Sequence, residues 1–238
     1  MCGRYRLTRT DKALLAHQFG LREEDIPDYA DELDNAPGSW RSVIDAADGE
    51  RKWTNMRWGY AMEVEGGRRF VFNAKAENLT KSAMWKRMFG NRCIIPASGF
   101  YEWKKVNGRP GPKYEITVRD QPIFGFAALY DDKVNPKTGE TERVFWIITT
   151  RPNPFFAEYH DRQPVILDRG EYDAWLAKSG PPPLHLLRVF PQEKMVITKV
   201  ADAKEPKPKA RNKPADDEPT LPGCSIEGLG CRASGCAE

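Results

Sequence analysis

Apolar and polar residues follow a strand-like pattern through the middle of the chain. Residues 114–118 alternate as a half-buried strand does, whereas 93–95, 124–130 and 144–149 are short apolar runs. Turn residues such as those at 135–139 separate the runs. Consecutive strands joined by short turns, without the crossover helices of a parallel sheet, predict an antiparallel sheet or barrel.

The pattern outside this region predicts shorter elements. Asp11 can cap a helix that places Leu14, Leu15 and Phe19 on one face, and Gly20 ends it. An acidic stretch up to residue 34 shows no periodicity and is expected to be irregular. Further strands are predicted over 42–47, 51–60, 70–72, 100–106 and 195–200, and further helices over 78–89, 153–160 and 171–178.

The composition changes after residue 200. The segment 201–238 mixes Lys, Asp, Glu and Pro with little to bury, and predicts a disordered tail. Its cysteines, Cys224, Cys231 and Cys236, are spaced C-x6-C-x4-C with no His nearby, so an oxidisable tail is favoured over a metal site. Residues 2–200 are therefore expected to form one folded domain.

Charge and cysteine content narrow the function classes. The 238 residues are 40% hydrophobic with a net charge of +3, so any nucleic-acid site must be a local basic patch. Cys2 and Cys93 are the only cysteines before the tail, which argues against a disulfide framework. No segment reads as a signal peptide or membrane span. We expect a cytoplasmic monomer without a cofactor or a metal.

The N-terminal residues offer unusual chemistry. Removal of Met1 would give Cys2 a free α-amine beside its thiol, with reference pKa values of about 8 and about 8.5. The amine can form an imine with an aldehyde, and the thiol can close onto the imine carbon as a thiazolidine. The alternative is that Cys2 is simply a small apolar residue.

Three other side chains suit acid–base or positioning roles. Glu102 lies among aromatic residues, and partial burial would raise its pKa, although it can equally be a solvated strand residue. His160 follows a predicted short helix and is either a catalytic group or a structural cap. Asn73 can orient a substrate or satisfy a turn.

Eight short segments form an ordered pattern: MCGRY at 1–5, NAP at 35–37, RWG at 57–59, NAKAE at 73–77, RCIIPASGFYEW at 92–103, FAALY at 126–130, IITT at 147–150 and HDRQP at 160–164. The pattern resembles the SRAP (SOS response-associated peptidase) family of abasic-site processing proteins. The resemblance covers residues 2 to about 200. Lys75 and Gln163 depart from the family's usual Arg and Met.

The resemblance implies an α+β fold: a single β-rich domain around a partly open antiparallel barrel with short flanking helices. It implies single-stranded DNA with abasic sites as partner, a covalent link from Cys2 to the sugar aldehyde, and self-cleavage that removes Met1, which would make the protein a lyase- or hydrolase-type enzyme. Association with the nucleoid follows from DNA binding. The family's catalytic positions correspond here to Cys2, Asn73, Glu102 and His160.

DNA contacts are assigned to local cations and an aromatic residue. Arg4, Lys75 and Arg162 are the candidate phosphate contacts, and Trp103, with Trp58 as a second candidate, can stack on an exposed base. Two other functions remain open. One is a non-covalent single-strand binding module in which Cys2 is incidental, and the other is an N-terminal-nucleophile peptidase.

Overall fold

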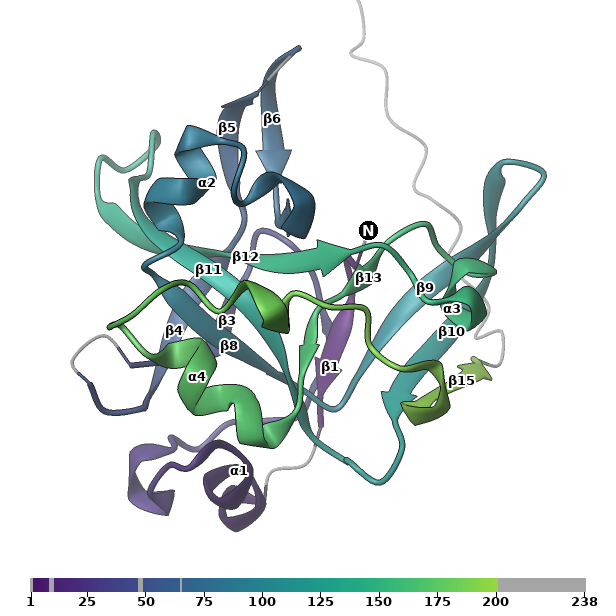
Figure 1. The fold of residues 1–238 in the computed structure, drawn as a ribbon, viewed down its shortest axis with the longest axis horizontal. Coiled ribbons are helices and arrows are strands. Elements are labelled where there is room, and N and C mark those ends of the chain that lie inside the picture. The colour runs from purple at the N-terminus through teal and green to yellow at the C-terminus, as the bar shows by residue number, and fades with distance from the viewer. Residues whose placement is uncertain (1, 9–10, 47–48, 65, 201–238) are drawn as a thin grey trace, which may run out of the picture. The chain divides into compact units, whose positions relative to one another are not determined.

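The structure is a computed structural model of the chain, and it describes residues 2–8, 11–46, 49–64 and 66–200. Met1 and the predicted tail at 201–238, with its three cysteines, lie outside the described residues. The described residues form the fold drawn in colour in Figure 1. In this part of the chain, no helix has the length and apolar character needed to cross a membrane.

Five strands close into a barrel. Hydrogen-bonded neighbours follow the order β12–β4–β3–β8–β11, and β11 pairs back with β12 to complete the ring. All of these pairings are antiparallel except β12–β4, which is parallel. The strands are β3 (Trp40–Asp45), β4 (Lys52–Trp58), β8 (Arg92–Ala97), β11 (Phe124–Val134) and β12 (Thr141–Thr150).

The apolar runs of the sequence correspond to strands that are buried on both faces. Along β8, Ile94 packs in one core cluster and Ile95 in the other, and the same alternation continues in β11 and β12. The first cluster lies against the helices, and the second includes the inner side of a neighbouring sheet. Burial on both faces explains why these strands read as continuous apolar segments.

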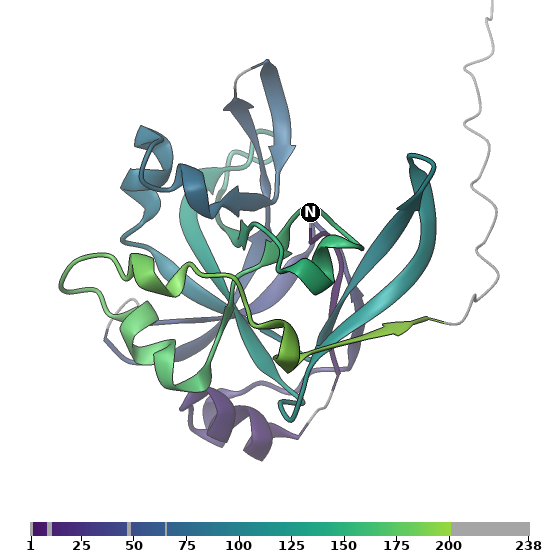
Figure 2. The ribbon, with the colours of Figure 1, turned by 45° about the vertical axis from the view of Figure 1, so that its right-hand side comes forward.

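A second, five-stranded sheet has the order β15–β10–β9–β1–β2 and is antiparallel throughout. Its two longest strands form a hairpin that projects from the body of the domain (Figures 1 and 2). The turn of this hairpin is Asn107-Gly108, with φ of 52° and 75°. The strands are β1 (Tyr5–Leu7), β2 (Glu32–Asn35), β9 (Gly99–Val106), β10 (Arg109–Val118) and β15 (Met195–Lys199).

Shorter strands complete the architecture. A two-stranded hairpin stands at the top of Figure 1, and three very short strands add to the barrel sheet. The hairpin is β5 (Tyr60–Val64) and β6 (Gly67–Val71), and the added strands are β7 (Asn73–Lys75), β13 (Gln163–Pro164) and β14 (Ile166–Leu167).

The helices are short and flank the barrel. Helix α1 (Lys12–Phe19) begins at Asp11, whose side chain accepts hydrogen bonds from two backbone N–H groups, and ends at Gly20 with φ of 64°. The other α-helices are α2 (Ala83–Met88), α3 (Pro154–Ala157) and α4 (Tyr172–Leu176). Short 3₁₀ helices span Glu23–Asp25, Ala76–Asn78, Arg169–Glu171, Leu184–Leu186 and Gln192–Lys194.

The predicted α+β class, with a barrel and short flanking helices, is confirmed, and the barrel is a closed ring with one parallel pairing. The prediction of an irregular acidic stretch is wrong in part, because Glu32–Asn35 pairs with β1. The predicted helix at 78–89 is shorter than expected and covers only Ala83–Met88. Strands β1 and β7, of three residues each, were too short to show periodicity.

Candidate functional site

Strand pairing brings four distant segments together. Cys2 lies just before β1, which pairs with β9 and so approaches Glu102. Asn73 begins β7, which runs parallel to β12, and β12 also pairs with β13, close behind His160. The four predicted catalytic residues therefore come from four segments that meet at one place.

The Cys2 side chain is fully buried, with 0% exposure, in the cluster that includes Tyr5 and Trp58. Burial raises the pKa of the Cys2 thiol well above its usual range, and the charge of Glu102 raises it further. The reference pKa of about 8.5 therefore does not describe the Cys2 thiol in the folded protein. A neutral thiol needs a base to take its proton as it reacts.

Asn73 fixes the backbone of Cys2. Its amide Nδ2 donates a hydrogen bond of 2.9 Å to the Cys2 carbonyl oxygen. The Asn73 side chain is buried, and its Oδ1 has no hydrogen-bond partner among the described residues. A buried acceptor without a partner carries an energetic penalty that a ligand donor would relieve.

Glu102 is a buried carboxyl group, only 5% exposed. Burial raises its pKa from 4.5 to about 7. Its Oε1 is buried and also lacks a hydrogen-bond partner within the described ranges. The solvated-strand interpretation of Glu102 is therefore wrong, and the group can both give and accept a proton near neutral pH.

His160 faces Glu102. Its Nε2 lies 3.9 Å from Glu102 Oε2, and its Nδ1 accepts a 3.0 Å hydrogen bond from the Arg162 backbone N–H. Burial lowers the pKa of His160, and the charge of Asp161, 2.8 Å from Nδ1, opposes this. Burial prevails because the Asp161 side chain is 86% exposed and its charge is screened by water. Nδ1 thus has both a donor, the Arg162 N–H, and a carboxylate oxygen of Asp161 within 3.0 Å, while Nε2 points toward Glu102.

The predicted phosphate contacts differ in their availability. Lys75 is exposed, and Arg4 pairs with Asp34 at 3.3 Å, with the two side chains 39% and 54% exposed. The Arg162 guanidinium instead makes two hydrogen bonds of 2.9 and 2.8 Å to Glu77 and is 14% exposed. Arg162 is thus held by a carboxylate that the sequence did not suggest as a site residue. Glu77 follows Asn73 by four positions in the NAKAE segment, which is the one signal that pointed to it.

The two candidate stacking residues have different surroundings. Trp58 is fully buried and donates its Nε1–H to the Phe72 carbonyl at 2.8 Å, so its predicted contact with DNA is wrong. Trp103 is half-buried and lies on the face of β9 opposite to Glu102, because adjacent strand residues alternate. Lys113 Nζ sits 5.3 Å from the Trp103 ring. Of the two predicted stacking residues, only Trp103 is therefore partly exposed.

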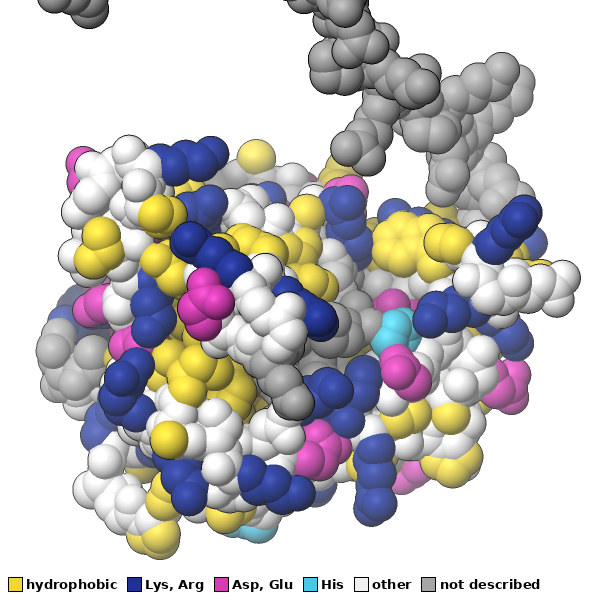
Figure 3. Space-filling model, turned by 90° about the horizontal axis from the view of Figure 1, so that it is seen from above, with side chains coloured by type: hydrophobic (Ala, Val, Ile, Leu, Met, Phe, Trp, Pro, Cys, Tyr) yellow, Lys and Arg dark blue, Asp and Glu magenta, His cyan; other side chains and the backbone are white. Residues whose placement is uncertain are grey.

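Figure 3 shows many Lys and Arg side chains on the face viewed from above, toward which the β5–β6 and β9–β10 hairpins project.

No group of three or more metal-ligating side chains occurs in the part of the chain that the structure describes. The site therefore has acid–base and nucleophilic groups of its own, bordered by cations.

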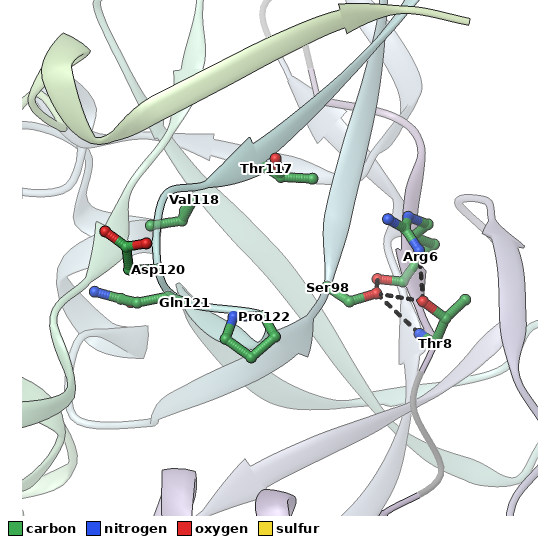
Figure 4. Close-up of a pocket in the computed structure, with 8 residues that line it drawn as sticks. All are labelled: Arg6, Thr8, Ser98, Thr117, Val118, Asp120, Gln121 and Pro122. Carbon is green, nitrogen blue, oxygen red and sulfur yellow. Dashed lines mark hydrogen bonds between the residues drawn. The ribbon is translucent and has the colours of Figure 1, made fainter.

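A separate cleft lies on another surface. It has a volume of about 410 Å³ and is lined by polar residues that include Arg6, Thr8 and Ser98 (Figure 4). Arg6 is already engaged by Glu115 and Thr8. None of the four predicted catalytic residues lines this cleft.

Comparisons with known proteins relate the chain to one family and one fold. The model of the SOS response associated peptidase (SRAP) family matches residues 1–204. The chain is 32% identical over 196 residues to abasic site processing protein YoaM of Bacillus subtilis, covering 78% of this chain and 83% of that protein. It is 28% identical over 180 residues to abasic site processing protein YedK of Escherichia coli, covering 74% and 79%. A crystal structure from Bordetella bronchiseptica shares the fold, with a TM-score of 0.69, 23% identity, and coverage of 84% of this chain and 100% of that one.

Proposed function

This chain belongs to the SRAP family, and from that premise we propose that it processes abasic sites by binding single-stranded DNA and crosslinking Cys2 to the open-chain aldehyde of the lesion. The product is a thiazolidine ring that joins protein and DNA and shields the strand from cleavage. The hydrogen bond from Asn73 to the Cys2 carbonyl carries the proposal. This bond fixes the backbone of Cys2. If the Cys2 side chain were only a core residue, its backbone would not need this bond.

The reaction begins with release of Met1, which frees the Cys2 amine. The amine adds to C1′ of the aldehyde and forms an imine with loss of one water molecule. The thiol sulfur then bonds to the imine carbon, the S–H bond breaks, and the nitrogen gains a proton. Holding both nucleophiles on one fixed residue replaces an encounter by an intramolecular step.

Glu102 is the proton carrier in this scheme. The thiol is neutral because it is buried, so the ring closure needs a base beside it. The carboxylate of Glu102 acts on Cys2 strongly enough to raise the pKa of the thiol, and its own pKa of about 7 lets it accept and return a proton. The same group can return the proton to sulfur when the adduct reverses.

His160 acts on the sugar. The neutral ring with its proton on Nε2 can donate to the ring oxygen of the cyclic hemiacetal and favour the open aldehyde. The unpartnered oxygens of Asn73 and Glu102 are matched to donors that the structure itself does not supply, such as the Cys2 amine or a sugar hydroxyl.

A denaturing gel with an abasic oligonucleotide tests the proposal. The native protein should give a heat-stable adduct, and Cys2→Ala should give none. An oligonucleotide with a tetrahydrofuran in place of the abasic sugar lacks the aldehyde and serves as the control, because it should bind without crosslinking. Absence of an adduct with the native protein would overturn the proposal.

The complete burial of Cys2 favours a second candidate, a non-covalent single-strand binding module in which Cys2 is a core residue. That function predicts equal binding of abasic and tetrahydrofuran strands, with no adduct. Self-cleavage at Met1 is the peptidase part of our proposal. It predicts that Glu102→Gln retains Met1 when the protein is made without a methionine aminopeptidase.

A further inference from the structure

The β9–β10 hairpin continues outward from the site. Residues 103–113 form its outer half and contain four cations and no Asp or Glu. We define these residues as the cationic arm, which projects from the domain in Figures 1 and 2. The cations of the arm are Lys104, Lys105, Arg109 and Lys113.

The base of the arm is held against the segment that carries His160. The rings of Tyr114 and Tyr159 meet edge to face at 4.7 Å. Lys104 lies 5.1 Å from the centre of the Tyr159 ring and 3.4 Å from Glu158. These contacts fix the direction of the arm relative to the site, so that binding along it costs little additional ordering.

Two cations of the arm are available to a ligand. Lys105 and Arg109 are exposed, and neither has an ion-pair partner among the residues that the structure describes. Burial is the main cause of the lowered pKa of His160, and the charge of Lys105 contributes to it as a smaller cause. The Lys105 charge therefore lies near the site. At about 3.3 Å per strand residue, Lys105 lies about 10 Å along β9 from Glu102, on the face of the strand that carries Trp103.

The remaining charges near this path are already balanced or solvated. Glu158 is paired with Lys104, and Asp161 projects into solvent beside His160. Lys113 lies on the rings of Tyr101 and Trp103, 4.0 and 5.3 Å from their centres. The path from the site to the tip of the arm therefore carries net positive charge. This charge suits the regularly spaced phosphates of a nucleic-acid backbone better than an acidic peptide.

We propose that the cationic arm binds the backbone of the DNA strand next to the abasic nucleotide, with Lys105 and Arg109 binding the phosphates. This inference rests on the proposed function and extends the DNA interface beyond the site, to one flank of the lesion. The arm adds affinity without reading sequence, since phosphate groups carry no base information. The slope of log K against log salt concentration is negative, and removing either cation should reduce its magnitude by about 0.7.

Fluorescence anisotropy with a tetrahydrofuran strand tests the arm without crosslinking. Lys105→Ala with Arg109→Ala should weaken binding of a long strand about 25-fold at about 0.1 M salt, and should lower the salt slope by about 1.4. A short strand that ends beside the lesion should bind the double variant and the native protein alike. Lys105→Arg should bind as the native protein does.

Lys137→Ala is the matched control. It removes an exposed Lys from the β11–β12 hairpin, on the opposite side of Figure 1, and should leave affinity and slope unchanged. Equal affinity of the double variant and this control for the long strand would overturn the inference, as would an equal loss on both strands. Failure of the crosslink itself is a separate result, because these measurements use a strand that cannot react.

Discussion

Glu102 Oε2 and His160 Nε2 face each other at 3.9 Å, although one belongs to a long strand and the other follows a short helix. Burial reverses the usual order of their pKa values: that of Glu102 rises from 4.5 to about 7, and that of His160 falls below its usual 6.5. Near neutral pH Glu102 can therefore exchange a proton while His160 stays a neutral imidazole. This pairing leads to tests of both stability and rate.

Glu102→Gln should stabilise the folded protein at alkaline pH. Because the pKa of the folded state is raised above 4.5, the protonated carboxyl favours folding at low pH, and this contribution is lost as pH rises through about 7. The variant should gain up to about 3 kcal/mol over the native protein above this range, and little below pH of about 4.5. Denaturant unfolding as a function of pH measures the difference. A constant difference at all pH values would contradict a buried, titrating carboxyl.

The crosslinking rate should rise with pH through about 7, as Glu102 ionises and becomes able to take the thiol proton. Glu102→Gln should slow the reaction about a hundredfold or more and remove this rise. Single-turnover gels at a series of pH values give the rates. If the variant keeps the same inflection, another group is the base.

Asn73→Ala should slow crosslinking at least about tenfold, because the Cys2 backbone loses its donor and the amine loses its fixed direction. Affinity for a tetrahydrofuran strand should change little. Asn55→Ala, at an exposed position of β4, is the matched control and should react at the native rate. An unchanged rate in Asn73→Ala would remove the positioning role.

Glu77→Gln tests whether Arg162 contacts DNA. Glu77 is hydrogen-bonded to Arg162, which lowers the pKa of the carboxyl. If Arg162 also binds phosphate, weakening this pair should strengthen DNA binding and steepen its salt dependence. Anisotropy over a range of salt concentrations measures both. Weaker binding would show that the pair serves only to hold the chain next to His160.

The sequence predicted the elements whose own residues determine them. Helix α1 begins after Asp11 and ends at Gly20, because Asp11 accepts from backbone N–H groups of the first turn and the Gly20 N–H donates to a carbonyl of the last turn. The apolar runs of β8, β11 and β12 became barrel strands because they are buried on both faces. Strand β2 was missed because its central residues, Leu33 and Asp34, are exposed and show no alternation, and only pairing with β1 makes the segment a strand.

In the site too, features set by a residue's own type could be predicted from the sequence, whereas features set by distant residues could not. The reactive types at Cys2 and Glu102 were evident from the sequence, but their protonation states were not, because burial comes from residues far along the chain. The partner of Arg162 was not foreseen either, since Glu77 and Arg162 are brought together only by the pairings of β7 and β13 with β12. Contacts between distant segments leave no local periodicity to read.

Mass spectrometry of the N-terminal peptide from the purified adduct, alkylated with iodoacetamide after denaturation, tests the central claim most directly. The account predicts a peptide that begins at Cys2, carries the sugar with the loss of one water molecule, and takes up no alkyl group because its sulfur is bonded to C1′. A crosslinked peptide that retains Met1, or one whose Cys2 thiol is alkylated, would contradict the proposed ring.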